Sequence, residues 1–223
     1  MSPVPTVPAS RLGRTPKQDR SRASFERVLD AAARLMEERG YAGFSLNDVV
    51  TRSRASIGSI YGRVSGKDEL IRAAQHRVLA RLELEQADMY ARIRRRALPL
   101  PELITALVRE MADFLGRNAQ TLNAFMARAQ ADRAVHHFGR RAYQHAQLDF
   151  KMLVIERRGE LTVADADHAA DVCFSLMFSA MSHHFGVGRL PGNDEPGDVE
   201  TLIKDLADVF LAYLAASKRR RAR

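Results

Sequence analysis

The chain has 223 residues, 46% of them hydrophobic and 28% charged, which is enough apolar material for one large domain or two small ones. A single cysteine, Cys173, excludes an internal disulfide framework and favours a reducing compartment. No apolar run reaches about 18 residues, and prolines break the first nine, so we expect no membrane span, no secretory signal and a cytoplasmic location.

The net charge of +8 is unevenly distributed along the chain. Residues 1–77 carry +6, residues 78–217 carry −3, and the basic tail of residues 218–223 carries +5. This asymmetry fits a DNA-binding N-terminal domain followed by a nearly neutral body, whereas a generally arginine-rich composition would spread the charge evenly.

Residues 1–20 contain four prolines among small polar residues and are predicted to be a disordered basic arm. The basic side chains in and just after this segment could lie along phosphates or enter a minor groove, or they could form a solvated leader. They are Arg11, Arg14, Lys17, Arg20 and Arg22.

A helix is predicted from Phe25 to Arg39, with Gly40 as its end, and two short helices follow it within residues 44–70. Apolar residues at i, i+3, i+4 spacing mark the short helices; they are Leu46, Val49 and Val50, then Ile57, Ile60, Tyr61 and Val64. Residues 51–55 leave room for a tight turn between them. This arrangement is typical of a helix-turn-helix.

Three serines are predicted to cap these helices and the next one: Ser45 with Asp48, Ser56, and Ser65 with Asp68. The second short helix begins with small residues that would let its backbone approach the major groove closely, while hydroxyl and N–H groups bind phosphates. Any capped helical hairpin could show the same spacing, so the pattern alone leaves both interpretations open.

From Ser24 to Gln75, the segments VLDAAARLMEERGYAGFSLNDVV and SIGSIYGRVSGKDEL resemble the N-terminal domain of the TetR family of transcriptional repressors. We assign the helix-turn-helix domain to residues 21–68. The resemblance implies that Ser45, Tyr61 and Lys67 contact phosphates. It also implies that the groove-facing start of the recognition helix comprises Ser56, Ile57, Gly58 and Ser59.

The sequence departs from the family pattern at the turn and in the recognition helix. Arg54 stands where the family usually has glycine, and Ile57 where it usually has a basic residue. Ile57 could contact a thymine methyl group or belong to the core, and Arg54 could supply the charge that Ile57 lacks. These departures concern the operator sequence and leave the predicted fold unchanged.

The rest of the chain is predicted to be helical as well, and residues 69–217 would form an effector-binding and dimerisation domain. The first of these helices would link the two domains as a lever, and Gly116 and Gly159 would end two others. The expected helices span residues 68–96, 101–116, 121–129, 132–158, 165–187 and 198–217. The fold class is therefore all-α, with about nine helices in total.

An effector pocket is predicted from flexible, mostly apolar side chains, which suit a hydrophobic ligand, although the same residues could simply fill the core. In residues 132–158 the apolar stripe is taken as Phe138, Ala142, Leu148, Met152 and Ile155. His145 falls in line with it, as a core residue or a polar anchor. The candidate pocket residues are Phe125, Met126, Phe138, His145, Met152, Phe174 and Met177.

The resemblance implies a homodimer in which the last two helices of each subunit form a four-helix interface. Residues 165–187 are apolar over a wide arc, as a helix covered on two sides requires. The candidate interface residues are Phe178, Met181, Phe185, Leu202, Leu206, Val209, Phe210 and Tyr213. A two-fold dimer of this kind would read an inverted repeat in double-stranded DNA.

Two other functional classes use residues that this sequence contains. A metal or redox sensor could use His145, His183, His184 or Cys173, but the apolar pocket favours an organic effector. An enzyme is disfavoured because the chain has no phosphate loop, dinucleotide fingerprint or nucleophile elbow, and we expect no cofactor or metal. The predicted function is a transcriptional repressor that a small hydrophobic effector releases from a palindromic operator.

Overall fold

The computed structural model describes residues 16–187 and 197–216, and these residues contain helices but no strands. The helices are α1 (Pro16–Arg39), α2 (Leu46–Ser53), α3 (Ile57–Tyr61), α4 (Lys67–Arg95), α5 (Leu100–Ala129), α6 (Arg133–Ile155), α7 (Ala166–His184) and α8 (Val199–Leu214), with a 3-10 turn at Arg158–Glu160. None of these helices is both long and apolar enough to cross a membrane. The all-α fold class is therefore confirmed.

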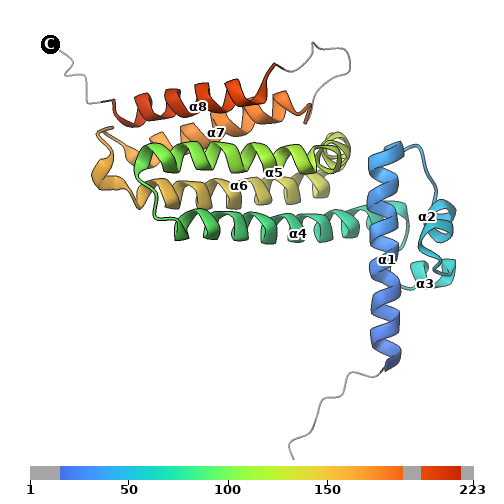
Figure 1. Cartoon of the computed structure of the whole chain (residues 1–223). Coiled ribbons are helices and arrows are strands. Elements are labelled where there is room, and N and C mark those ends of the chain that lie inside the picture. The colour runs from blue at the N-terminus through green and yellow to red at the C-terminus, as the bar shows by residue number, and fades with distance from the viewer. Residues whose placement is uncertain (1–15, 188–196, 217–223) are drawn as a thin grey trace, which may run out of the picture.

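The helices form two groups that share α4 (Figure 1). Helices α1 to α3 gather at one end, whereas α4 to α8 lie side by side as a bundle that α1 crosses. Each group has its own buried apolar cluster. The N-terminal cluster continues past residue 68 into α4, where it includes Leu70, Ile71 and Ala74, and it also takes in Phe125 of α5.

The prediction that Gly116 ends a helix was wrong, because α5 runs without a break from Leu100 to Ala129. A glycine inside a helix costs only about 1 kcal/mol relative to alanine, which packing can outweigh. Here a Cβ atom at position 116 would lie 3.0 Å from the ring of Phe185. The glycine therefore makes room for an aromatic side chain that follows α7.

Two predicted helix starts also differ from the structure. Helix α1 begins at Pro16, so residues 16–20 are helical and do not belong to a disordered arm, whereas residues 1–15 lie outside the described part of the chain. Proline is favoured in the first turn of a helix, where its missing N–H leaves no partner unsatisfied. Ser65 does not cap α4, because Gly66 takes the cap position and the Ser65 N–H donates to Glu69 Oε2 at 2.6 Å.

The face of α6 that points inward was predicted incorrectly. Its buried residues are Val135, Ala146, Phe150, Leu153 and Val154, whereas Leu148 and Met152 of the predicted stripe are exposed. The small side chain at position 146 lets α4 come close enough for the Tyr90 hydroxyl to donate to the Ala146 carbonyl oxygen at 3.3 Å. The buried face is therefore marked by Phe150 and Leu153 together with Ala146, and the predicted stripe left out all three.

Candidate DNA-binding interface

Helix α2 begins with the predicted capping box. The Asp48 N–H donates to Ser45 Oγ at 3.3 Å, and the Ser45 N–H donates to Asp48 Oδ2 at 2.7 Å. Hydrogen bonds from the side chain and the backbone of Ser45 hold the pKa of Asp48 below its usual value. The box fixes the direction in which α2 leaves the preceding loop.

The turn between α2 and α3 depends on a left-handed residue. Arg54 has φ 56° and ψ 28°, and its N–H donates to the Val50 carbonyl oxygen at 2.9 Å. This conformation costs most residues about 1–2 kcal/mol and costs glycine almost nothing. The geometry therefore explains why glycine suits this position, and it leaves the Arg54 side chain exposed beside α3.

Helix α3 presents a small, open surface to solvent. Its core contacts come from Ile60, which is fully buried, and from Val64 just after it. Ile57 and Tyr61, assigned to the same apolar stripe, are instead 39% and 57% exposed, so the core interpretation of Ile57 was wrong. A Cβ atom at Gly58 would meet no atom within 4 Å.

The start of α3 is held by a second cap, since the Ser59 N–H donates to Ser56 Oγ at 3.1 Å. Ser56 and Gly58 are exposed and Ser59 is half-buried. The structure therefore brings together on one surface the four residues proposed to face the groove, with Tyr61 one turn further along.

Basic side chains lie on the same domain, and some of them already form ion pairs or hydrogen bonds within it whereas others do not. Arg52 makes a two-pronged ion pair with Glu38, both N–O distances being 2.7 Å. Arg63 donates to Ser21 Oγ at 2.7 Å and stacks 4.8 Å from the Phe25 ring. Arg22 and Arg54 are exposed and pair with no carboxylate among the described residues, which leaves them available for phosphates.

Lys67 begins α4, but its ammonium group points to the loop between α1 and α2. Nζ donates hydrogen bonds to the carbonyl oxygens of Tyr41 and Phe44 and lies 4.4 and 4.0 Å from the centroids of their rings. Burial, with a further contribution from the charge of Arg128, lowers the pKa of this amine. Because two of its three donors are used inside the domain, the geometry favours a structural role over the implied phosphate contact.

Replacing Lys67 by methionine tests this role, since methionine keeps an apolar stem and removes the ammonium group. We expect the free energy of unfolding to fall by about 1–3 kcal/mol, because two carbonyl oxygens lose their donor. We expect the salt dependence of DNA binding to stay the same. Chemical denaturation and binding titrations over a range of salt concentrations measure both. Unchanged stability with a salt slope shallower by about 0.9 per protomer would establish a phosphate contact instead.

The residues predicted to form an effector pocket do not come together as one group. Phe174 and Met177 are fully buried in the body, but Phe125 belongs to the N-terminal cluster, and Met126 and Met152 are exposed. Phe138 packs edge-on against His76, with ring centroids 5.8 Å apart. His145 is exposed, and its Nδ1 lies 3.5 Å from Glu83 Oε1, so it is not a core residue. The predicted residues of α6 lie apart from the others because the wrong face of that helix was expected to point inward.

Cys173 lies fully buried in α7, within the cluster of the body. Burial raises the pKa of its thiol from an ordinary value of 9.0 to about 12. We expect a thiol reagent to modify this residue at least about a thousandfold more slowly in the native protein than in the unfolded chain, because burial makes the reactive thiolate scarcer and keeps the reagent away from it. Labelling at pH 8 with and without denaturant measures the ratio, and equal rates would contradict it.

The predicted dimer residues divide between the outside and the inside of the protomer. Met181 and Phe210 are fully buried in the body and are not available to a partner, and Phe185 packs on Gly116 of α5. On the outer side of α8, Leu202, Leu206 and Tyr213 are partly exposed and Val209 is 54% exposed. Leu176 of α7, which is 50% exposed, was not among the predicted residues although it lies in the same apolar arc.

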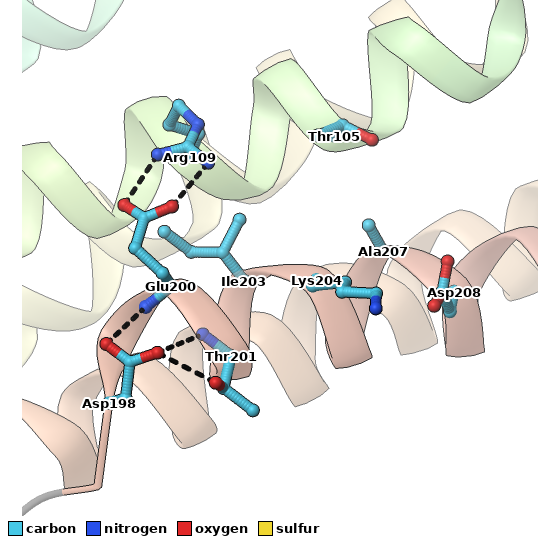
Figure 2. A pocket seen from close by; sticks show the side chains of 9 residues that line it. All are labelled: Thr105, Arg109, Asp198, Glu200, Thr201, Ile203, Lys204, Ala207 and Asp208. Atoms are coloured by element: carbon cyan, nitrogen blue, oxygen red, sulfur yellow. Dashed lines mark hydrogen bonds and ion pairs between the residues drawn. The ribbon is translucent and has the colours of Figure 1, made fainter.

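Two surface hollows lie outside the predicted sites. A cleft of about 460 Å³ between α5 and α8 is bridged by Arg109 and Glu200, whose two N–O distances are 2.7 Å (Figure 2). A groove of about 520 Å³ lies between the end of α1 and α5, beside Phe185. No group of three or more histidine, cysteine or acidic side chains among the described residues could hold a metal ion.

Comparison with known families finds one match in the N-terminal part of the chain. The family described as bacterial regulatory proteins, tetR family, matches residues 28–74. This segment runs from α1 into α4 and contains the whole of α2 and α3. A comparison with curated proteins gives no match.

Solved structures extend the likeness to the body. A protein from Mesorhizobium loti MAFF303099 assigned to the TetR family is 17% identical, with 88% of this chain and 99% of that chain covered and a TM-score of 0.72. One from Syntrophomonas wolfei str. Goettingen, assigned to the same family, is 10% identical, with 90% and 99% covered and a TM-score of 0.66. A TetR transcription regulator from Haloarcula marismortui ATCC 43049 is 17% identical, with 86% and 97% covered and a TM-score of 0.62.

These likenesses agree with the geometry of the interface. Residues 28–74 match the N-terminal domain of the family, and the described helices as a whole share the fold of its solved members. The chain is therefore similar to TetR-family regulators in its N-terminal helix-turn-helix domain, and it shares the fold of solved structures assigned to that family.

Proposed function

We propose that this protein is a sequence-specific transcriptional regulator that binds an inverted-repeat operator as a homodimer. The observation that carries the proposal is the open surface of α3, where Ile57, Gly58 and Tyr61 face solvent while Ile60 holds the helix to the domain. A surface free of bulk at its centre suits insertion into a major groove about 12 Å wide.

Each exposed group on this surface has a chemically suitable partner in DNA. The side chain of Ile57 is apolar and would contact a thymine methyl group, the one apolar feature of the major groove edge. The phenol of Tyr61 would bind a phosphate oxygen, and the exposed guanidinium groups of Arg22 and Arg54 would do the same. Phosphate contacts would then set the register, and α3 would read the bases.

A selection of bound fragments from random double-stranded DNA tests the proposal. We expect enrichment of an inverted repeat whose half-sites are about 34–36 Å apart, or a multiple of that spacing. Binding should weaken steeply as salt concentration rises. Replacing Ile57 by asparagine should change the preferred base at one position of each half-site. A selection that enriches no sequence would contradict the proposal.

We propose that the outer faces of α7 and α8 form the dimer interface. Leu176 and Val209 are both about half exposed, and Leu202, Leu206 and Tyr213 extend the apolar face along α8. Large aliphatic side chains repeated along adjacent helices lose an unfavourable contact with water when a second copy covers them.

We further propose that the protein acts as a repressor and that a small hydrophobic effector releases it from the operator. Support comes from an aromatic group in the body, in which Tyr143 lies 5.2 Å from Phe174 and 5.0 Å from Phe178, centroid to centroid. To change the ratio of DNA-competent to DNA-incompetent protein from 99:1 to 1:99, an effector must favour the DNA-incompetent state by about 5.5 kcal/mol.

A panel of apolar compounds tests the effector proposal in two steps. Compounds that raise the melting temperature are first identified, and their effect on operator affinity is then measured. We expect at least one stabilising compound to weaken operator binding. If every stabilising compound leaves operator affinity unchanged, release by a hydrophobic effector is contradicted.

A further inference from the structure

A chain of charged and polar side chains joins the N-terminal domain to the corner between α5 and α6. We call it the corner network, and it consists of Tyr41, Asp68, Arg72, Arg128 and Asp132. The Tyr41 hydroxyl donates to Asp68 Oδ1, which also accepts from Arg128 Nη2 at 2.9 Å. Arg128 Nη2 lies 3.4 Å from Asp132 Oδ2, which accepts from Arg72 Nε at 3.0 Å.

Arg128 is the central member of the corner network and is mostly buried, although it is the last basic residue of α5. Its guanidinium carbon lies 3.8 Å from the centroid of the Tyr41 ring, in the loop that leads into α2. Its Nε is buried and has no hydrogen-bond partner among the described residues. This partly unsatisfied guanidinium group contacts three segments: the loop before α2, the start of α4 and the start of α6.

Asp132, at the other end of the corner network, is bound to the body through α6. Its side chain is only 2% exposed and caps α6, because the N–H groups of Ala134 and Val135 donate to it at 3.0 and 3.3 Å. Burial alone would raise the pKa of this carboxyl, but hydrogen bonds from Arg72 and the two N–H groups lower it below its usual value. The carboxylate is therefore charged at neutral pH and fixed in position by α6 itself.

We propose that Arg128 is a positioning residue for DNA binding, because it fixes the orientation of the helix-turn-helix domain on the body. Arg128 lies at the bend between α5 and α6, and it contacts the two segments that flank α2 and α3, at Tyr41 and Asp68. A displacement of this corner would therefore turn the recognition helix relative to the body. The functional consequence rests on the DNA binding proposed above, whereas the orientation itself does not.

The alternative is that α4 alone sets the orientation, since it runs continuously from one domain into the other. A single helix resists bending but leaves rotation of a small domain about it poorly restrained. The packing of α1 on α5 adds one restraint, which includes a hydrogen bond from Thr121 Oγ1 to Glu37 Oε1. Arg128 adds a second, because it contacts Tyr41 just after α1 and Asp68 at the start of α4, and two restraints define an orientation that one does not.

The orientation is measured by the distance between two spin labels, at Asn47→Cys on α2 and Gln144→Cys on α6, both exposed positions. Cys173 is replaced by alanine, and labelled protein is diluted with unlabelled protein so that each dimer carries one labelled protomer. We expect Arg128→Ala to widen the distance distribution at least about twofold and to weaken operator binding about tenfold without changing its salt slope. Arg109→Ala, which breaks an exposed ion pair on the same helix, should change neither quantity.

A second variant covers the case in which Arg128→Ala does not fold. Asp68→Asn removes the partner charge at a side chain that is 53% exposed, so folding is preserved, and it should widen the distribution as well. Distributions as narrow as the wild type in Arg128→Ala, or in Asp68→Asn if the first variant is unfolded, overturn the proposal. If the distance distributions widen but the protein binds no DNA, the proposed function is refuted. Arg128 would then still fix the orientation of the helix-turn-helix domain on the body.

Discussion

The Gly58→Leu variant is expected to fold as stably as the wild type and to lose operator affinity by about 100-fold or more. A Cβ atom added at this position meets no atom within 4 Å, and leucine favours a helix more than glycine does. The same side chain would stand where the floor of the major groove must approach α3. Several base contacts, each worth about 1–3 kcal/mol, would be lost together.

Thermal unfolding and binding titrations on the selected operator measure the two effects separately. Gly139→Leu in α6 is the matched control, because a Cβ atom there also meets nothing within 4 Å. The control should keep its operator affinity. Equal affinities for Gly58→Leu and the wild type would show that this part of α3 does not enter the groove.

The Val209→Asp variant is expected to remain folded, to become monomeric and to bind the inverted repeat about 100-fold or more less tightly. Val209 is 54% exposed on the outer side of α8, so the change leaves the protomer core intact. At an interface between two copies, the charge would be buried against its own symmetry mate and lose its hydration. Operator affinity falls because two half-sites are no longer bound by one linked pair.

Sedimentation analysis gives the mass in solution, and circular dichroism shows that the fold is kept. Leu84→Asp in α4 is the matched control, because Leu84 is an aliphatic residue that is even more exposed, at 74%. That variant should stay dimeric. If Val209→Asp sediments as a dimer and Leu84→Asp does not, the interface lies on the α4 side of the body.

The features that were predicted correctly from the sequence are those with local causes. Ser45 with Asp48 and Ser56 cap the two short helices as predicted, and the helices expected from Asp132, Asp165 and Asp198 begin one residue after those positions. A cap is decided by side chains within one turn of the backbone, so the sequence shows it directly. The helical class, the turn before α3 and the division of charge between the ends and the middle follow from equally short-range patterns.

Contacts between distant segments decided the rest. Gly116 lies inside α5, where a Cβ atom would come within 3.0 Å of the Phe185 ring, and the inward face of α6 includes Ala146, which α4 approaches closely. Lys67 binds carbonyl oxygens more than 20 residues earlier in the chain. Arg128 meets Asp68 across 60 residues. Helix periodicity and capping are properties of neighbouring residues, whereas burial and pairing depend on which helices pack together, and only the folded chain specifies that.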